Sequence, residues 1–383
     1  MIRLEGVTKQ YAEGSPAVDN LTLQAGTGEI TVLVGPSGCG KTTSLRMINR
    51  MIEPTSGRIL IDGQDTAQVP AAKLRRDIGY VIQHAGLFPH RTVLHNVMTV
   101  PRLNGWSRAR AETRAHEVLD LVGLPGDFAS RYPAQLSGGQ QQRVGVARAL
   151  ASDPSVMLMD EPFSAVDPIA REGLQDDILR LQAELGTTIV LVTHDIDEAI
   201  KLGHRVAVLR QGGLLAQFSS PADLLAHPAD DFVADFVGRD RGYRALSFQR
   251  HDVPVHPEEP VPLGQPLARR GDAWLLAVDA ESRPQGWVVP AEVGEAPVGP
   301  EHLHRGGTVA SADGSLRALL DAALSSPSGR GVVVRDGALA GTVRAEEVLA
   351  AIQAAPRADG TSIRSEDLRT PADDGSTVRG DHP

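Results

Sequence analysis

The sequence contains a single cysteine, Cys39, so no disulfide bond can form within the chain. Acidic residues outnumber Lys and Arg by 48 to 38, and this balance argues against a general nucleic-acid-binding surface, so we expect no nucleic-acid partner. No run approaches the roughly 18 to 20 apolar residues that a membrane-spanning helix requires, and the first residues form no apolar signal-peptide core. We therefore expect a cytosolic protein that reaches a membrane only through a partner.

The length and composition favour two folded domains. Hydrophobic residues make up 41% of the 383 residues, an ordinary share for a globular protein with a sizeable core. Over residues 1–240, short β-branched runs alternate with longer helical patterns, which predicts a mainly parallel sheet covered by helices. The apolar runs of this part lie at 30–34, 59–61, 78–82, 156–159, 188–192 and 206–209.

The composition changes after residue 240. Residues 241–262 include a polar, proline-rich stretch and are predicted to form a linker. A second, smaller domain is expected over 263–355, because a strand, a turn, a second strand opening with glycine and a helix start occur there twice. These copies begin at Trp274 and Val332. Residues 356–383 are poor in apolar side chains and are predicted to form a disordered tail.

The nine residues after the apolar run at 30–34 are the most informative stretch of the chain. They fit the pattern of a glycine, four residues and Gly-Lys-Ser/Thr, which is the phosphate-binding P-loop, between a strand pattern and a helix pattern. The nucleotide-binding residues predicted here are Gly35, Pro36, Ser37, Gly38, Cys39, Gly40, Lys41, Thr42 and Thr43. Lys41 would reach the β- and γ-phosphates, and the Thr42 hydroxyl would bind Mg²⁺. The run therefore predicts binding of ATP or GTP.

Two further motifs follow the P-loop. A serine and two glycines precede a helical run at 144–150, and such a helix start is a second candidate anion site. The residues of this site are Ser137, Gly138, Gly139 and Gln140. Later, the buried strand pattern at 156–159 ends in two adjacent carboxylates. Asp160 would hold Mg²⁺, directly or through water. Glu161 would polarise the attacking water as a general base.

In this order, the three motifs resemble those of the ATP-binding cassette (ABC) ATPases. Tyr11 matches the family's aromatic residue that stacks on adenine, and Gln83 matches the glutamine that senses Mg²⁺ and the γ-phosphate. The run 164–167 matches the loop that crosses the dimer interface, and His194 matches the switch histidine. The resemblance implies as catalytic residues Lys41, Glu161 and His194. It implies as Mg²⁺-binding residues Thr42, Gln83 and Asp160.

The resemblance also implies a fold and an assembly. The fold is a P-loop NTPase of the α/β class, with a mainly parallel sheet, an antiparallel subdomain and a helical subdomain. In this family, ATP lies between the P-loop of one subunit and the Ser-Gly-Gly-Gln site of another. We therefore expect a homodimer or a pair of related ATPase subunits that closes when ATP binds and opens after hydrolysis.

Within the family, residues 1–240 resemble the ATPase subunits of importers for glycine betaine, choline, carnitine or proline. The stretches that carry this similarity are 47–57, 78–90 and 194–202. It implies a separate membrane permease, an extracytoplasmic substrate-binding protein as an indirect partner, and a peripheral place on the cytoplasmic face of the cell membrane. Two alternatives stay open: the ATPase of an importer for another solute (sugar, sulfate or methionine), and a soluble ABC ATPase unrelated to transport.

The repeat in the second domain resembles a degenerate pair of CBS motifs, a small α+β regulatory module. Copies that bind nucleotide place Thr or Ser three residues after the strand glycine and Asp six after it. Here these positions hold Val289 and Glu292 in the first copy and Arg344 and Glu347 in the second. Nucleotide binding is therefore in doubt, and a structural or an electrostatic-sensing role is an equal alternative.

Overall fold

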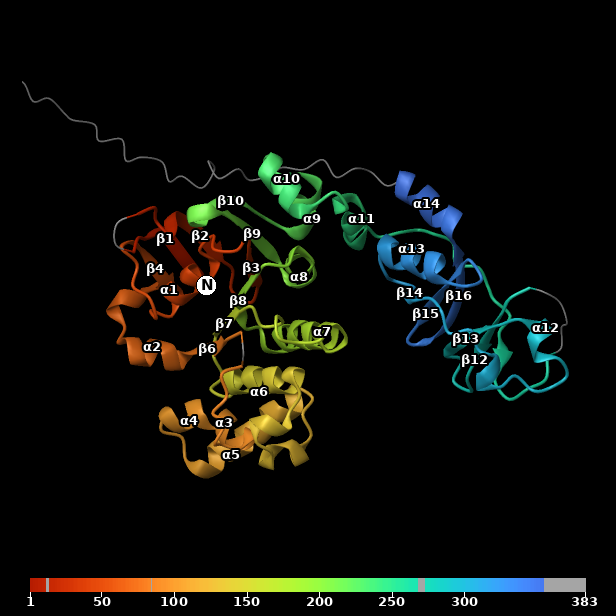
Figure 1. Cartoon of the computed structure of the whole chain (residues 1–383), viewed down its shortest axis with the longest axis horizontal. Helices are drawn as coiled ribbons and strands as arrows, with labels where there is room; N and C mark the ends of the chain where they lie inside the picture. Colours follow the sequence, from red (N-terminus) through yellow and green to blue (C-terminus); the bar gives the residue numbers. More distant parts are fainter. Residues whose placement is uncertain (12–13, 84, 268–272, 355–383) are drawn as a thin grey trace, which may run out of the picture. The chain divides into compact units, whose positions relative to one another are not determined.

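The computed structural model describes residues 1–11, 14–83, 85–267 and 273–354, and the predicted tail at 356–383 lies outside these ranges. The described chain forms two compact units, the first over Met1–Val237 and the second beginning at Gly238 (Figure 1). No helix in these ranges is both long enough and apolar enough to cross a membrane. We describe each unit by itself.

A six-stranded sheet forms the centre of the first unit. Its pairs are parallel except for the pair of β9 and β10, which joins at Gln211–Gly213. In spatial order the strands are β10 (Leu214–Ser219), β9 (Arg205–Arg210), β3 (Ile30–Val34), β8 (Thr188–Thr193), β7 (Val156–Asp160) and β6 (Ile78–Val81). All residues of β3, β7 and β8 are buried, as expected for parallel strands covered on both faces. This sheet confirms the predicted α/β class.

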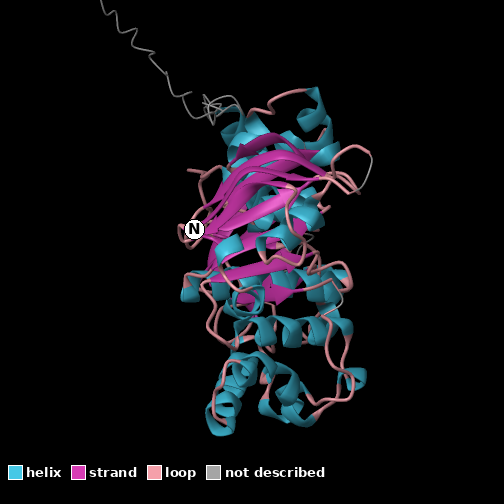
Figure 2. Ribbon diagram, turned by 90° about the vertical axis from the view of Figure 1, so that its left-hand side faces the viewer, coloured by secondary structure: helices cyan, strands magenta, loops and turns pink. Residues whose placement is uncertain are grey.

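Helices and a second sheet complete the first unit (Figures 1 and 2). The second sheet is antiparallel, in the order β2 (Val18–Ala25), β1 (Ile2–Lys9), β4 (Ser56–Ile61) and β5 (Gln64–Asp65). The helices close to the two sheets are α1 (Lys41–Ile48), α2 (Ala71–Asp77), α7 (Pro168–Leu185), α8 (Ile196–Leu202), α9 (Pro221–Ala226) and α10 (Asp231–Val237). A further helical layer consists of α3 (Val93–Val97), α4 (Thr99–Leu103), α5 (Arg108–Leu121) and α6 (Gly138–Leu150), and α6 packs against β6. The predicted parallel, antiparallel and helical parts are therefore all present.

One buried cluster joins the two sheets of the first unit through helix α1. It contains Leu45 and Met47 of α1, Ile2 of the antiparallel sheet, and Leu33 and Leu158 of the parallel sheet. Each such side chain contributes on the order of 2 kcal/mol when fully buried. The helix that follows the P-loop is therefore held on both sides, and this fixes the direction in which its first turn points.

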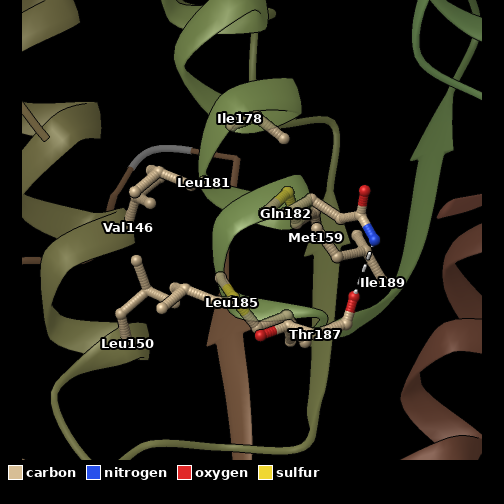
Figure 3. Close-up of a pocket in the computed structure, with 10 residues that line it drawn as sticks. Val146, Leu150, Met159, Ile178, Leu181, Gln182, Leu185, Thr187 and Ile189 are labelled. Carbon is tan, nitrogen blue, oxygen red and sulfur yellow. Dashed lines mark hydrogen bonds between the residues drawn. The ribbon is translucent and has the colours of Figure 1, made fainter. Parts of the chain in front are cut away.

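A small apolar seam lies between α6 and α7 over β7 and β8 (Figure 3). Val146 of α6 and Leu181 and Leu185 of α7 line it, and Gln182 donates a hydrogen bond to the carbonyl of Thr187 at 3.5 Å. The enclosed volume of about 10 Å³ is room for at most one water molecule. The seam is therefore core packing between the helical layer and the sheet, and we assign no ligand to it.

The second unit contains two three-stranded sheets of similar design. In each, a parallel pair is followed by an antiparallel hairpin and then by a helix. The first half comprises β11 (Val261–Pro262), β12 (Leu275–Val278), β13 (Pro284–Val288) and α12 (Pro290–Val293). The second half comprises β14 (Val309–Ser311), α13 (Leu316–Ser325), β15 (Arg330–Arg335), β16 (Ala338–Arg344) and α14 (Ala345–Ala354). The described residues between β11 and β12 form no helix that would correspond to α13.

The strand glycine of each half occupies an equivalent place. Gly286 in β13 has a φ of 152° and Gly341 in β16 has a φ of 150°. A Cβ atom on either would meet the backbone of another segment, His304 for Gly286 and His256 for Gly341. Both glycines lie inside their strands, so the prediction that the second strand of each copy opens with glycine was wrong. Close approach of a neighbouring backbone, rather than a turn, requires glycine here.

The structure also differs from the predicted linker at 241–262. Helix α11 (Arg241–Ala245) begins this segment, and Leu246 and Val253 are buried in a cluster with residues of α13, β15 and β16. The backbone of His256 then pairs with Thr342 of β16 in both directions. Proline-rich composition signalled a loop, but the apolar residues spaced along it anchor the segment to the second unit.

Candidate functional site

The P-loop connects the end of β3 to the first turn of α1. Gly35, Gly38 and Gly40 all have positive φ, at 157°, 76° and 103°. A Cβ atom on Gly35 would lie 2.3 Å from the carbonyl oxygen of Leu209, and one on Gly40 would lie 2.3 Å from that of Ala17. Glycine at 35 and 40 is therefore a steric requirement of this loop, as expected for a backbone that curls around an anion.

The loop lines an open cavity of about 640 Å³, which is large enough for a nucleotide. All nine predicted P-loop residues line this cavity, together with Ala17, Glu161, His194 and Phe236. The cavity thus brings together all three predicted catalytic residues, Lys41 in the P-loop and Glu161 and His194 beyond it, although they are far apart in sequence.

Lys41 is only 5% exposed, and its ammonium group is directed back at the loop. Nζ donates hydrogen bonds to the carbonyls of Gly35 at 2.8 Å and Pro36 at 2.9 Å. The Cys39 thiol lies 3.9 Å from the same nitrogen, and burial raises the pKa of this thiol. These are neutral partners, and no carboxylate pairs with Lys41 in the described part of the chain. A phosphate group is a stronger acceptor and would compete well for the ammonium group.

Thr42 and Asp160 come together as predicted for Mg²⁺ ligands. The Thr42 hydroxyl donates to Asp160 Oδ1 at 2.8 Å, across 118 positions of sequence. The other oxygen of Asp160 lies 3.7 Å from Arg46 Nη2 and 3.5 Å from the hydroxyl of Tyr80. Burial, and secondarily the charge of Asp160, raises the pKa of Tyr80, so Tyr80 stays a neutral hydrogen-bond donor. A hydroxyl and a carboxylate oxygen side by side fit the hard oxygen ligands that Mg²⁺ prefers.

Glu161 stands at the carboxyl end of β7 with a φ of 46°, which is left-handed and uncommon for glutamate. Its N–H donates to the carbonyl of Val192 at 2.9 Å, which fixes the backbone in this conformation. Glu161 Oε2 lies 3.2 Å from Nδ1 of His194 and 3.5 Å from Nε2 of Gln83. Strain of this kind is common at functional sites. Gln83 and His194, both predicted site residues, therefore contact the same oxygen atom of the predicted base Glu161.

The Ser-Gly-Gly-Gln run begins helix α6, as predicted. The Ser137 side chain accepts the N–H of Gln140, and the Gln140 side chain accepts the N–H of Ser137, so the two form a capping box. The carboxamide of Gln140 therefore caps its own helix. None of Ser137, Gly138, Gly139 and Gln140 lines the P-loop cavity. Within one chain, this helix start and the P-loop remain separate sites.

Tyr11 does not line the P-loop cavity either. Its ring is 51% exposed and lies 5.0 Å from Lys9 Nζ, so its predicted stacking on adenine stays a prediction. The structure also brings in residues that no motif signalled. Phe236 of α10 lines the cavity, and Arg46 and Tyr80 contact Asp160. Arg46 and Tyr80 each lie within five positions of a recognised motif residue, but nothing in the pattern around Phe236 indicates a nucleotide site.

A second open cavity, of about 590 Å³, lies on the helical layer. Its lining combines apolar and cationic side chains: Phe88, Arg91, His95, Met98, Thr99, Arg102, Leu103 and Arg108. Asn96 holds the loop at its edge, since its side chain accepts the N–H of Phe88 at 2.7 Å and donates to the carbonyl of Phe88 at 3.1 Å. Phe88, which belongs to the stretch 78–90 noted above, therefore lines a groove on the surface of the helical layer.

In the second unit, both positions that a nucleotide-binding CBS copy gives to Asp are occupied by glutamates paired with histidines. Glu292 accepts a hydrogen bond from His304 Nε2 at 2.7 Å, and Glu347 contacts His256 Nε2 at 2.8 and 3.0 Å. The hydrogen bond from His256 holds the pKa of Glu347 below its usual value. The backbone of each histidine also pairs with the residue after the strand glycine. The two halves thus use the same contact.

A family profile described as ABC transporter matches residues 18–164. The chain is 49% identical over 310 residues to the osmoprotectant import ATP-binding protein OsmV of Salmonella typhimurium, covering 77% of this chain and 81% of that protein. It is 52% identical over 241 residues to the carnitine transport ATP-binding protein OpuCA of Listeria monocytogenes, covering 63% of this chain and 60% of that protein. The OsmV alignment, at 310 residues, is longer than the first unit, so the similarity extends beyond that unit.

Among solved structures, the chain resembles MJ0796, whose structure is described as dimeric and as a bacterial ABC transporter cassette. The match has a TM-score of 0.53 and 38% identity, and it covers 58% of this chain and 99% of that one. A second structure of the same cassette is described as a dimeric, post-hydrolysis state bound to ADP and Pi, and it matches equally well. The geometry around the P-loop and these similarities point in the same direction.

Proposed function

Because the chain belongs to the family of ABC transporter ATP-binding proteins, we propose that it is the ATP-hydrolysing subunit of an importer for quaternary amine osmoprotectants. The observation that carries the catalytic part is the convergence of Gln83 and His194 on one oxygen of Glu161, beside the P-loop. The substrate class rests on the names of the relatives, one of which is similar over most of both chains.

ATP binding would exchange partners that the structure already provides. Lys41 would move its hydrogen bonds from the carbonyls of Gly35 and Pro36 to phosphate oxygens, which are charged acceptors. Backbone N–H groups of the P-loop at the start of α1 would bind the same phosphates. Thr42 and Asp160 would hold Mg²⁺, with Gln83 as a further ligand. Bound Mg²⁺ supplies charge neutralisation for the phosphate oxygens.

Glu161 would act as the general base that polarises the attacking water. Its left-handed backbone and its bond to the Val192 carbonyl keep the carboxylate aimed into the cavity. His194 Nδ1 and Gln83 Nε2 both contact Oε2 of this carboxylate and would restrict its position. Positioning of this kind is the main contribution that side chains make to phosphoryl transfer.

We further propose that the complete site requires a second ATPase subunit. Ser137, Gly138 and Gly139 do not line the cavity of their own chain, and they would contact the γ-phosphate bound to a partner. Closure of such a dimer depends on contacts that exist only with the γ-phosphate, so hydrolysis would reverse it. The dimeric descriptions of the similar cassette structures support this arrangement.

The groove on the helical layer is the proposed docking site of a membrane permease. Phe88, Met98 and Leu103 offer apolar contacts, while Arg91 and Arg102 offer positive charge. A short amphipathic helix with acidic residues would complement such a groove. Through this contact the subunit would sit on the cytoplasmic face of the membrane, with a substrate-binding protein acting on the far side. The second unit, with its duplicated halves, is proposed to be a CBS-like regulatory module.

The test is reconstitution of the chain with a membrane permease that co-purifies with it, followed by solute uptake. We expect ATP-dependent uptake of glycine betaine, choline or carnitine, and no uptake with E161Q. Uptake of a sugar, sulfate or methionine alone would replace the substrate class and keep the transport function. ATPase activity without any permease partner, in a chain that binds no membrane protein, would favour the soluble alternative.

A further inference from the structure

The loop that follows Gln83 is held by side chains of helix α6. Arg148 donates from Nη2 to the carbonyl of Ala85 at 2.6 Å and from Nη1 to the carbonyl of Gly86 at 2.7 Å. Gln142, which is 2% exposed, places Nε2 3.5 Å from the carbonyl of Ile82. Backbone carbonyls on both sides of Gln83 are therefore bound by one helix.

The backbone of this loop requires such support. Ala85 has a φ of 53° and Gly86 a φ of 55°, so two consecutive residues are left-handed. For alanine this conformation costs on the order of 1 kcal/mol. At Gly86 the positive φ favours glycine, and a Cβ atom there would also displace the tip of the Ile82 side chain, 2.3 Å away at Cδ1. The guanidinium of Arg148 binds the carbonyls of these same two residues.

The guanidinium of Arg148 contacts carbonyl groups of the loop rather than a carboxylate. Among the described residues no carboxylate forms an ion pair with it, and burial lowers its pKa. Arg143, five positions earlier on the same helix, instead forms an ion pair with Asp177 and donates to the carbonyl of Val122 at 2.6 Å. Burying a cation without a counterion costs free energy, and two hydrogen bonds to carbonyls offset little of that cost. A role in stability alone therefore does not explain Arg148.

The loop leads directly to the proposed catalytic base, because Gln83 Nε2 lies 3.5 Å from Glu161 Oε2. Ser137, the residue proposed to reach the nucleotide of a partner subunit, caps the start of the helix that holds this loop. We propose that Arg148 is a positioning residue for ATP hydrolysis, which holds Ala85 and Gly86 so that Gln83 reaches Glu161 and Mg²⁺. This inference rests on the role proposed above for Gln83.

The experiment is a double-mutant cycle on the full chain, with Q83A, R148M and Q83A/R148M. We expect R148M to lower turnover at saturating ATP about tenfold and to raise the half-saturating Mg²⁺ concentration several-fold, with ATP affinity in EDTA unchanged. If Arg148 acts through Gln83, the double variant hydrolyses ATP no more slowly than Q83A, because residues that act as a unit are not additive. R148K retains a donor and is expected to recover part of the loss.

The matched control is R143M, which removes an arginine from the same helix with no contact to the loop. Its effect on turnover should multiply with that of Q83A, and it should leave the Mg²⁺ requirement unchanged. If R148M multiplies with Q83A in the same way, or if it leaves the Mg²⁺ requirement unchanged, the role of Arg148 is overturned while Gln83 keeps its own. If Q83A hydrolyses ATP at the parent rate, the proposed role of Gln83 fails, and that of Arg148 with it.

Discussion

Histidine pairs with glutamate at the P-loop cavity of the first unit, and the same pairing holds Glu292 and Glu347 of the second unit in a different setting. Glu161 has a left-handed backbone at the end of a buried strand, and it faces an open cavity. Glu292 and Glu347 lie instead in the first turns of α12 and α14, where an acidic side chain is favoured by the helix dipole. Their histidines are also fixed by backbone pairing. Strain and a cavity, rather than the pair itself, mark the candidate catalytic site.

Of the changes that distinguish the two units, the substitution of Glu161 by Gln is expected to have the largest effect. E161Q removes the proposed general base and should lower ATP hydrolysis at least about 100-fold, since positioned bases contribute factors of that order or more. ATP should still bind, so the variant is expected to accumulate as an ATP-bound dimer, detected by size-exclusion chromatography with bound nucleotide.

The matched control is E347Q, the same chemical change at a histidine-paired glutamate of the second unit. It should hydrolyse ATP at the parent rate. Turnover of E161Q within tenfold of the parent would remove the role assigned to Glu161, whatever E347Q does.

The cations of the two units are also expected to respond differently. Lys41 contacts only neutral groups among the described residues and is available to phosphate, so K41A should weaken ATP binding by about 10- to 100-fold. Equilibrium binding of a fluorescent ATP analogue measures this. The thermal unfolding midpoint without nucleotide should change little, and an unchanged affinity for ATP would contradict the P-loop assignment.

In the second unit, Arg330 donates to both oxygens of Glu258 at 2.8 Å, and the Glu258 side chain is only 9% exposed. R330A leaves this carboxylate without its cation. We expect the second unit to lose on the order of 2 kcal/mol of stability. The loss is smaller than for a fully buried pair because the Arg330 side chain is 31% exposed and solvent screens its charge. Urea unfolding followed by tryptophan fluorescence is a suitable measurement, since Trp274 and Trp287 lie beside Arg330. ATP binding should be unaffected, and weakened binding would contradict the separation of roles.

The candidate site was more accessible from the sequence than the second unit, for a physical reason. The P-loop, Asp160 and Glu161 belong to short sequence motifs, because strand ends and helix starts set their geometry within a few residues. The pairs of His256 and His304 join segments 91 and 12 positions apart, and only the fold determines them. Phe236 and the grip of Arg148 on the loop depend on tertiary packing in the same way. The segment 241–262 was predicted to be a linker from its proline-rich composition, and composition does not reveal that Leu246 and Val253 are buried against the second unit.

The smallest effect concerns Glu198, a buried acid of α8 close to His194. It is 7% exposed and accepts a hydrogen bond from the Thr193 hydroxyl at 2.5 Å. Burial raises the pKa of Glu198, whereas the pKa of the histidine-paired Glu347 is lowered. A raised pKa means that the folded state binds the proton more tightly than the unfolded chain. The stabilising contribution of Glu198 is then complete below its unfolded pKa and is lost as the pH rises through the folded pKa.

Glutamine at this position removes the ionisation and keeps an oxygen that accepts the Thr193 hydroxyl. E198Q should therefore raise the thermal unfolding midpoint by about 1 to 3 °C at pH 8, and this gain should disappear as the pH falls toward 4.5. E184Q, at an exposed glutamate of α7 that contacts Arg180, is the control and should not gain stability at pH 8. A midpoint for E198Q below that of the parent at pH 8 would mean that the carboxylate stabilises the turn around His194 in its charged form.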